Sequence, residues 1–197
     1  MAGTSLWGYW RYTYPYGYSH SCSKSLGTSL RMYADDNFGW LPHGQATAEA
    51  SLSTLMKSDD TVRNLLRGKH IQQKVVDQAL RRDGVLGPES CGWHYVEGLR
   101  EDDDPQTAVI WDKVTGLWHN GNRRSGSSIM HEIIRLDGAM EFISRERWPE
   151  FVAEQKKLLA DTMAKRSKSD PPIRWSDEAT LGPNVNPPSP VAPARRP

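Results

Sequence analysis

The stretch CSKSLGTSLRMYADDNFGWLP, residues 22–42, decides the fold of this chain. Its apolar side chains recur at helical spacing, at Cys22, Leu26, Leu30 and Tyr33. This periodicity predicts a helix with one narrow apolar stripe. Asp35-Asp36-Asn37 followed by Gly39 is typical of a helix C-terminus, so we expect the helix to end near Asp36.

Composition limits the classes of function. The 197 residues suffice for one domain, and 25 basic and 24 acidic side chains leave a net charge of +1. This balance gives no overall field that would attract nucleic acid or an anionic membrane, so we expect no nucleic-acid binding. The sequence also contains no apolar run near the ~20 residues of a membrane span and no signal-peptide core.

The N-terminal segment, residues 1–21, is an arm rich in aromatic side chains, with glycines and a proline that disfavour a regular helix. The residues predicted to face a partner are Trp7, Trp10, Tyr12, Tyr14, Tyr16 and Tyr18. Trp and Tyr are enriched at membrane interfaces because each ring has an apolar body and one polar tip. The arm is therefore predicted either to contact a membrane surface or to pack on the domain or a neighbouring subunit.

Helical periodicity returns in residues 47–84. Thr47 is suited to cap the N-terminus of the first helix, and Gly84 is suited to end the last one. Gly68-Lys69-His70 is typical of a loop between them. This region is predicted to be a short helical insert before a sheet.

The sequence favours strands after Pro88. Residues 93–96 and 107–111 are rich in aromatic and β-branched side chains. The acidic run at residues 101–105 is typical of a solvated turn. The segment HEIIR at residues 131–135 lacks the second histidine of a zinc-protease helix and is predicted to be a strand.

Asp137-Gly138 predicts a β-hairpin with a two-residue type I′ turn. In that register Leu136 pairs with Ala139. The side chains expected on the core face are Ile133, Met140 and Phe142.

The C-terminal part is predicted to hold one helix and a tail. The helix spans residues 149–165 and has Pro149 in its first turn, where proline is tolerated. Residues 167–197 are rich in proline, so they are predicted to be disordered or extended. Trp175, within this tail, is predicted either to dock locally or to face a partner.

These elements predict an α+β fold with an N-terminal helix, a short helical insert, an antiparallel sheet of three or four strands and a C-terminal helix. The domain is expected to span residues 22–166. The predicted core is Leu26, Leu30, Tyr33, Leu52, Leu55, Leu66, Val76, Leu80, Trp93, Ile110, Trp111, Ile133, Leu136, Phe142, Trp148, Phe151 and Leu159.

Two groups of residues resemble a known family. The first, Cys22, Leu26, Leu30, Tyr33-Ala34, Asp36-Asn37, Gly39 and Pro42, is similar to the junction of stalk helix and head in bacterial prepilin-type proteins, especially the G-type pseudopilins of type II secretion. The second, Trp111-Asp112, His119-Asn120-Gly121 and Asp137-Gly138 with Phe142, resembles the C-terminal sheet of that group. Residues 1–21 do not match the hydrophobic half of the stalk, so the resemblance covers the head region.

The resemblance implies a non-catalytic structural or assembly subunit that acts through protein contacts in the bacterial envelope, as a homo-oligomer or within a larger assembly. It also implies an extracytoplasmic or envelope-associated location. The G-type head often carries a calcium site, but no ligand set of this sequence matches it residue by residue. A related alternative is that the chain is an accessory subunit of a larger complex and uses a pilin-like head.

The alternative from another functional class is a small metal-binding protein or metal-dependent hydrolase centred on His119. Imidazole and carboxylate side chains ligate zinc or calcium, and the candidates are His119, Asp112 and Asp103. No nucleophile elbow, phosphate-binding loop or dinucleotide fingerprint occurs in the sequence, so no enzymatic motif supports catalysis.

The chain has two cysteines, Cys22 and Cys91. Their separation makes no metal or redox motif, so the sequence leaves two alternatives open, a single disulfide and a pair of buried thiols.

Overall fold

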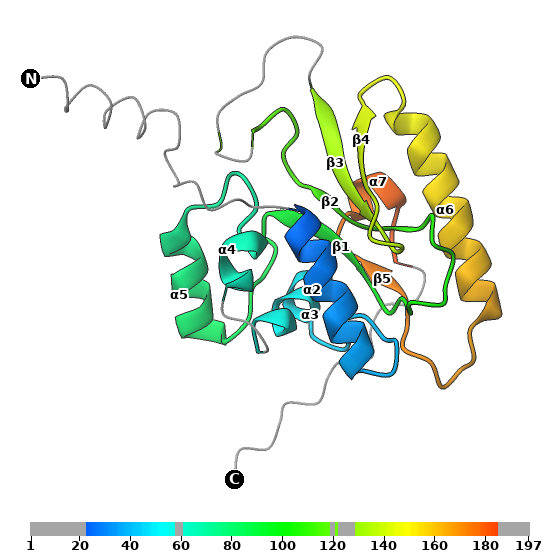
Figure 1. Cartoon of the computed structure of the whole chain (residues 1–197), viewed down its shortest axis with the longest axis horizontal. Coiled ribbons are helices and arrows are strands. Elements are labelled where there is room, and N and C mark those ends of the chain that lie inside the picture. The colour runs from blue at the N-terminus through cyan, green and yellow to red at the C-terminus, as the bar shows by residue number, and fades with distance from the viewer. Residues whose placement is uncertain (1–22, 58–60, 119–120, 122–128, 185–197) are drawn as a thin grey trace, which may run out of the picture.

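The structure is a computed structural model, and it describes residues 23–57, 61–118, 121 and 129–184. The predicted α+β fold is confirmed: helices surround one antiparallel sheet (Figure 1). Within these residues no helix is both long and apolar enough to cross a membrane.

The sheet has five strands in the order β4-β3-β2-β1-β5, whereas three or four were predicted. The strands are β1 (Trp93–Glu97), β2 (Ala108–Asp112), β3 (Met130–Arg135), β4 (Met140–Ser144) and β5 (Arg174–Trp175). The first four form a meander in which chain neighbours are also sheet neighbours, and β5 returns to the free edge of β1.

The described helices flank this sheet. They are α2 (Ser23–Asp36), α3 (Ala48–Leu52), α4 (Val62–Leu66), α5 (Gln73–Asp83), α6 (Trp148–Lys165) and α7 (Glu178–Leu181), with a 3-10 helix η1 (Ser53–Lys57) after α3. As predicted, α2 ends at Asp36, Thr47 caps α3 through a bond from the Ala50 amide, and Gly84 ends α5 with a left-handed conformation.

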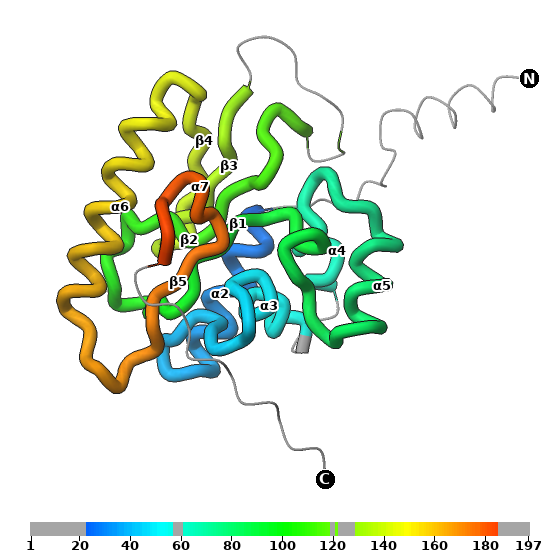
Figure 2. Tube along the Cα trace, turned by 180° about the vertical axis from the view of Figure 1, so that it is seen from behind, coloured from blue at the N-terminus to red at the C-terminus, as the bar shows by residue number. Residues whose placement is uncertain are grey.

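The two faces of the sheet are covered by different helices. Helix α2 lies on one face, in front of the strands in Figure 1, while α7 and β5 are nearest the viewer in the reverse view of Figure 2. Leu26 and Leu30 of α2 are buried. Gly27 lets the helix approach β3, because a Cβ there would lie 3.2 Å from Ile134 Cγ2.

Helix α6 packs on the opposite face. Its Phe151 and Leu159 are buried. The Trp148 ring stacks on His131 of β3, with 3.6 Å between the ring centroids. Gln155 accepts a hydrogen bond from the Ala108 amide at 2.7 Å, so the helix also satisfies a backbone donor of β2.

The β3–β4 hairpin differs from the prediction by one residue. The Arg135 amide donates to Ala139 O at 2.9 Å, and Gly138 has φ 80°, so the loop holds three residues with a left-handed glycine at its end. A shift of one residue moves every side chain to the other face. Met140 and Phe142 are therefore 45% and 38% exposed rather than in the core.

Most of the other predicted core residues are buried, with Tyr33, Leu80 and Trp148 partly buried against the core. The shifted register places Ile143 of β4 in the core instead of Phe142. The side chain of Tyr95 on β1 is also fully buried and donates to Pro42 O at 2.8 Å, which ties the loop after α2 to the sheet.

The predicted tail begins too early. Residues 174–175 pair with β1 and residues 178–181 form α7, so the described fold extends to Asn184. Trp175 is only 6% exposed, and its Nε1 donates to Gly182 O at 2.7 Å, so it docks locally, as one of the two alternatives predicted, and does not face a partner. Residues 185–197 lie outside the described part.

We expect Trp175→Ala to lower the free energy of unfolding by about 3–5 kcal/mol, because the substitution removes a buried indole and leaves a cavity. Urea unfolding followed by far-UV circular dichroism, which reports the backbone, would measure this loss. The matched control is Trp118→Ala, since Trp118 is 46% exposed and should cost clearly less. Equal stabilities of wild type and Trp175→Ala would show that β5 and α7 do not contribute to the fold.

Candidate functional site

The second residue after α2, Phe38, has an unusual backbone. The amides of Asn37 and Gly39 both donate to Ala34 O, at 2.9 and 2.8 Å, which closes the helix end. Between them Phe38 has φ 57°, in the left-handed region. Left-handed backbone costs an L-residue roughly 1–2 kcal/mol, and for a bulky side chain it is a genuine outlier.

Phe38 also lies in solvent. Its side chain is 89% exposed, the largest exposure among the large hydrophobic residues of the described part. Arg100 Nε donates to Phe38 O at 3.3 Å, which helps hold the turn. A strained turn that presents an aromatic ring to water contributes nothing to the core, and such strain is characteristic of functional positions.

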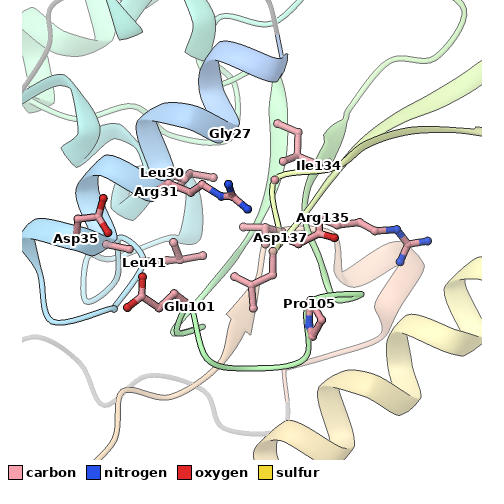
Figure 3. A pocket seen from close by; sticks show the side chains of 14 residues that line it. Gly27, Leu30, Arg31, Asp35, Leu41, Glu101, Pro105, Ile134, Arg135 and Asp137 are labelled. Atoms are coloured by element: carbon pink, nitrogen blue, oxygen red, sulfur yellow. The ribbon is translucent and has the colours of Figure 1, made fainter.

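A groove of about 540 Å³ runs beside α2 (Figure 3). Its apolar lining consists of Leu30, Ala34, Leu41, Val109, Ile134 and Leu136. Its charged lining consists of Arg31, Asp35, Glu101, Arg135 and Asp137. The groove therefore combines an apolar floor with charges of both signs, the composition of a surface that binds another protein.

The groove is positioned by three elements. Helix α2 supplies Arg31 and Asp35, and the β3–β4 turn supplies Asp137 (Figure 3). Glu101 follows β1, where its amide donates to Gly39 O at 2.9 Å. Arg135 is held by two bonds to Glu141 Oε2, at 3.0 and 2.6 Å.

A second cavity, also about 540 Å³, lies where α3 meets β5 and α7. There His94 stands between two residues that precede α7, with Nδ1 3.4 Å from Ser176 Oγ and Nε2 3.6 Å from Asp177 Oδ2. Burial lowers the pKa of His94, and the Asp177 carboxylate opposes this shift. A serine, a histidine and an aspartate in contact are the components of a nucleophilic site.

The hydrogen bonds of this group identify it as a brace instead. Asp177 accepts from Trp111 Nε1 at 2.9 Å and from the Thr180 amide at 3.2 Å. Ser176 Oγ accepts from the Tyr95 amide at 2.9 Å. Both side chains thus fasten the segment before α7 to β1 and β2.

The predicted metal candidates are not brought together. Asp103 accepts from the Arg100 amide at 2.7 Å and contacts Arg166, whereas Asp112 lies 3.5 Å from Lys69 Nζ. Each carboxylate is therefore engaged by its own cation. His119 lies outside the described residues, and within those residues no group of three or more His, Cys, Asp or Glu side chains is placed to hold a metal.

The choice between a disulfide and two buried thiols is not tested, because Cys22 lies outside the described residues. Cys91 is fully buried, and burial raises the pKa of its thiol to about 12, so the reactive thiolate is disfavoured. The predicted partner-facing residues of the arm, Trp7, Trp10, Tyr12, Tyr14, Tyr16 and Tyr18, also lie outside the described part.

Comparisons with protein-family models, with curated proteins and with solved structures each gave no match.

Sequence reasoning missed Phe38. The signal that points to it is Asn37-Phe38-Gly39 directly after a helix, where left-handed residues are expected and a large apolar residue is not. Its exposure depends on tertiary packing and cannot be read from the sequence.

The lowered pKa of His94 makes stability depend on pH. Below about pH 6.5, the ordinary pKa of histidine, the unfolded chain binds a proton that the folded chain binds only at lower pH, so the free energy of unfolding falls as the pH falls from about 6.5. We expect His94→Gln to weaken this dependence, by about 1.4 kcal/mol for each tenfold difference between the folded and unfolded dissociation constants. Urea unfolding at several pH values between 5 and 8 measures it.

His70 provides a second case, since burial also lowers its pKa, assisted by Lys113. The free energy of unfolding of the double variant His94→Gln, His70→Gln should change less with pH than that of either single variant. If the free energy of unfolding had the same pH dependence in wild type and His94→Gln, His94 would not be a source of that dependence.

Proposed function

We propose that this chain is a non-catalytic, pseudopilin-like structural subunit that assembles through protein–protein contacts in the bacterial envelope. The observation that carries the proposal is Phe38, an 89% exposed aromatic side chain held on a left-handed turn at the end of α2. Aromatic residues are enriched among the few that dominate binding energy at interfaces, and strain is retained where it serves a function.

The partner proposed for Phe38 is the groove of a second copy of this chain. The floor of the groove is lined by apolar residues, and its volume of about 540 Å³ is that of a binding pocket. A protruding apolar residue that fits a pocket elsewhere on the same molecule makes a heterologous contact, which generates rings or filaments rather than closed dimers. That is the kind of contact a structural assembly needs.

Charge supports the same pairing. The groove rim carries Arg31 beside Asp35, Glu101 and Asp137, so it offers partners of either sign to an approaching surface. The net charge of the chain is +1, and copies are therefore not kept apart by long-range repulsion. Rim charges of this kind fix orientation and selectivity more than they add affinity.

The position of Phe38 agrees with the resemblance to the stalk-to-head junction. If that resemblance holds, α2 corresponds to the end of the stalk helix, and Phe38 is the second residue after α2. An extracytoplasmic or envelope location and a role in a type II secretion-like assembly are parts of the proposal.

We expect wild-type full chain to self-associate as its concentration rises, and Phe38→Gly to weaken this association at least tenfold, about 1.4 kcal/mol or more. Glycine removes the ring and relieves the left-handed strain at an entropic cost of roughly 0.5–1 kcal/mol, so stability should be unchanged or up to ~1 kcal/mol higher. Sedimentation velocity and urea unfolding measure the two effects. Met32→Ala is the control, since Met32 is an exposed apolar residue of α2 outside the groove.

A mixing experiment tests the direction of the contact. Phe38→Gly keeps an intact groove, and Arg31→Glu on the groove rim keeps an intact Phe38. Mixed together, they should form one-to-one complexes that do not grow further. A wild-type chain that sediments as a monomer at every concentration, without a copurifying partner, would overturn the proposal.

A further inference from the structure

A buried ion cluster joins the helical insert to the sheet. Lys69, in the loop after α4, contacts Glu132 of β3 through its Nζ and lies 3.5 Å from Asp112 Oδ2 of β2. The side chains of Lys69, Asp112 and Glu132 are 4%, 4% and 9% exposed. A lysine and two carboxylates thus meet where water is almost excluded.

The carboxylate of Asp112 is unusual within this cluster. Both of its oxygens are buried and neither has a hydrogen-bond partner among the described residues. Buried carboxylates ordinarily accept several hydrogen bonds, because an unsatisfied one is costly. The neighbouring His131 Nδ1 lies 3.3 Å from Asp112 Oδ1 without the alignment of a hydrogen bond. The Asp112 carboxyl therefore lies beside Lys69 without a hydrogen bond from the described residues to either of its oxygens.

Lys69 is held in place by close packing of the backbone. A Cβ on Gly92 would lie 2.3 Å from Arg67 O, so the loop before β1 and the end of α4 touch at glycine. The Gly92 amide donates to Leu66 O at 2.8 Å, and Trp93 Nε1 donates to Leu65 O at 2.7 Å. The lysine Nζ lies 5.9 Å from the centroid of the Trp93 ring.

Glu132 is held as well. Its Oε1 accepts from the hydroxyl of Ser23, the first residue of α2, and its Oε2 contacts Lys69 Nζ. His131 is fixed by stacking on Trp148. Lys69 and Glu132 are therefore held in fixed positions beside Asp112, which is the preorganisation that a chemical step requires.

From this geometry we propose that Lys69 and Asp112 form an intramolecular isopeptide bond, with Glu132 as the catalytic proton carrier. The inference is independent of the proposed function, because it concerns a covalent bond within one chain.

The step is a condensation and needs no further reactant. A proton passes from the Lys69 ammonium to the Asp112 carboxylate, which gives an amine and a carboxylic acid in a cluster from which water is almost excluded. Nζ then attacks Asp112 Cγ. Glu132 takes a proton from Nζ and gives it to the departing Asp112 oxygen, so the N–C bond forms, one C–O bond breaks and one water molecule leaves.

Placement makes the reaction favourable. Well-oriented intramolecular reactants behave as if present at about 10⁵–10⁸ M, which offsets the tendency of water to reverse condensation. The exclusion of water from the cluster acts in the same direction. The product replaces a buried charged pair by a neutral amide.

Mass spectrometry of intact, denatured wild-type protein tests the proposal. We expect a mass lower than the sequence mass by one water molecule. After trypsin digestion, peptide 68–74 should be joined to peptide 101–113, because an amide at Lys69 blocks cleavage there. Lys69→Arg and Asp112→Ala should both restore the full mass, and Glu132→Gln should slow or abolish the loss while preserving the shape of the side chain.

Two controls separate this bond from other events. Lys113→Arg removes another lysine paired with a buried carboxylate, at 2.7 Å from Glu49, and should keep the mass deficit. Loss of water by succinimide formation at Asp137-Gly138 would leave the deficit on the peptide that contains residue 137 and would persist in Lys69→Arg.

The result on the wild type decides the question even if a variant fails to fold. A folded wild-type chain that keeps its full mass after prolonged incubation, with separate peptides 68–74 and 101–113, would overturn the proposal. A deficit located on any other peptide would also overturn it.

Discussion

The close approach of α2 to β3 is the contact on which the rest of the structure depends. It is possible because Gly27 has no Cβ: one added there would lie 3.2 Å from Ile134 Cγ2. The buried stripe of Leu26 and Leu30 then continues the contact along the helix. Displacing α2 would open the groove, whose floor it shares with β3, and would remove the Ser23 contact from Glu132. One small residue thus positions both ends of the helix.

The two ends of α2 serve different purposes. Its N-terminal end contributes a hydroxyl to the buried Lys69, Asp112 and Glu132 cluster, and its C-terminal end presents Phe38 to solvent. The first end faces the interior, where packing and desolvation hold charged groups in fixed positions. The second end faces outward, where a strained turn holds an apolar ring that the fold does not use. Helix α2 packs on the sheet through its buried stripe. The same helix therefore links the buried cluster of Lys69, Asp112 and Glu132 to the exposed side chain of Phe38.

How much could be predicted depended on the range of the interactions. Local signals were sufficient for the end of α2 at Asp36, the Thr47 cap and the Gly84 terminator, because each is decided within a few residues. The hairpin register was off by one, because Asp137-Gly138 suits both two-residue and three-residue loops. Trp175 was misassigned because its partner in the sheet, Val96, is far away in the sequence and the surrounding prolines resemble a tail.

The candidate sites show the same limit in a stronger form. Gly68-Lys69-His70 has the composition of a loop, and nothing in its neighbours indicates that Lys69 ends up only 4% exposed between two carboxylates. A buried lysine with such partners is weak evidence for stability, since the cost of desolvating the ions can exceed their attraction. A neutral covalent bond at the same place would not carry that cost. The Asp112 oxygens have ion contacts but no hydrogen bond among the described residues, which suits the proposed reacting group better than a salt bridge retained for stability.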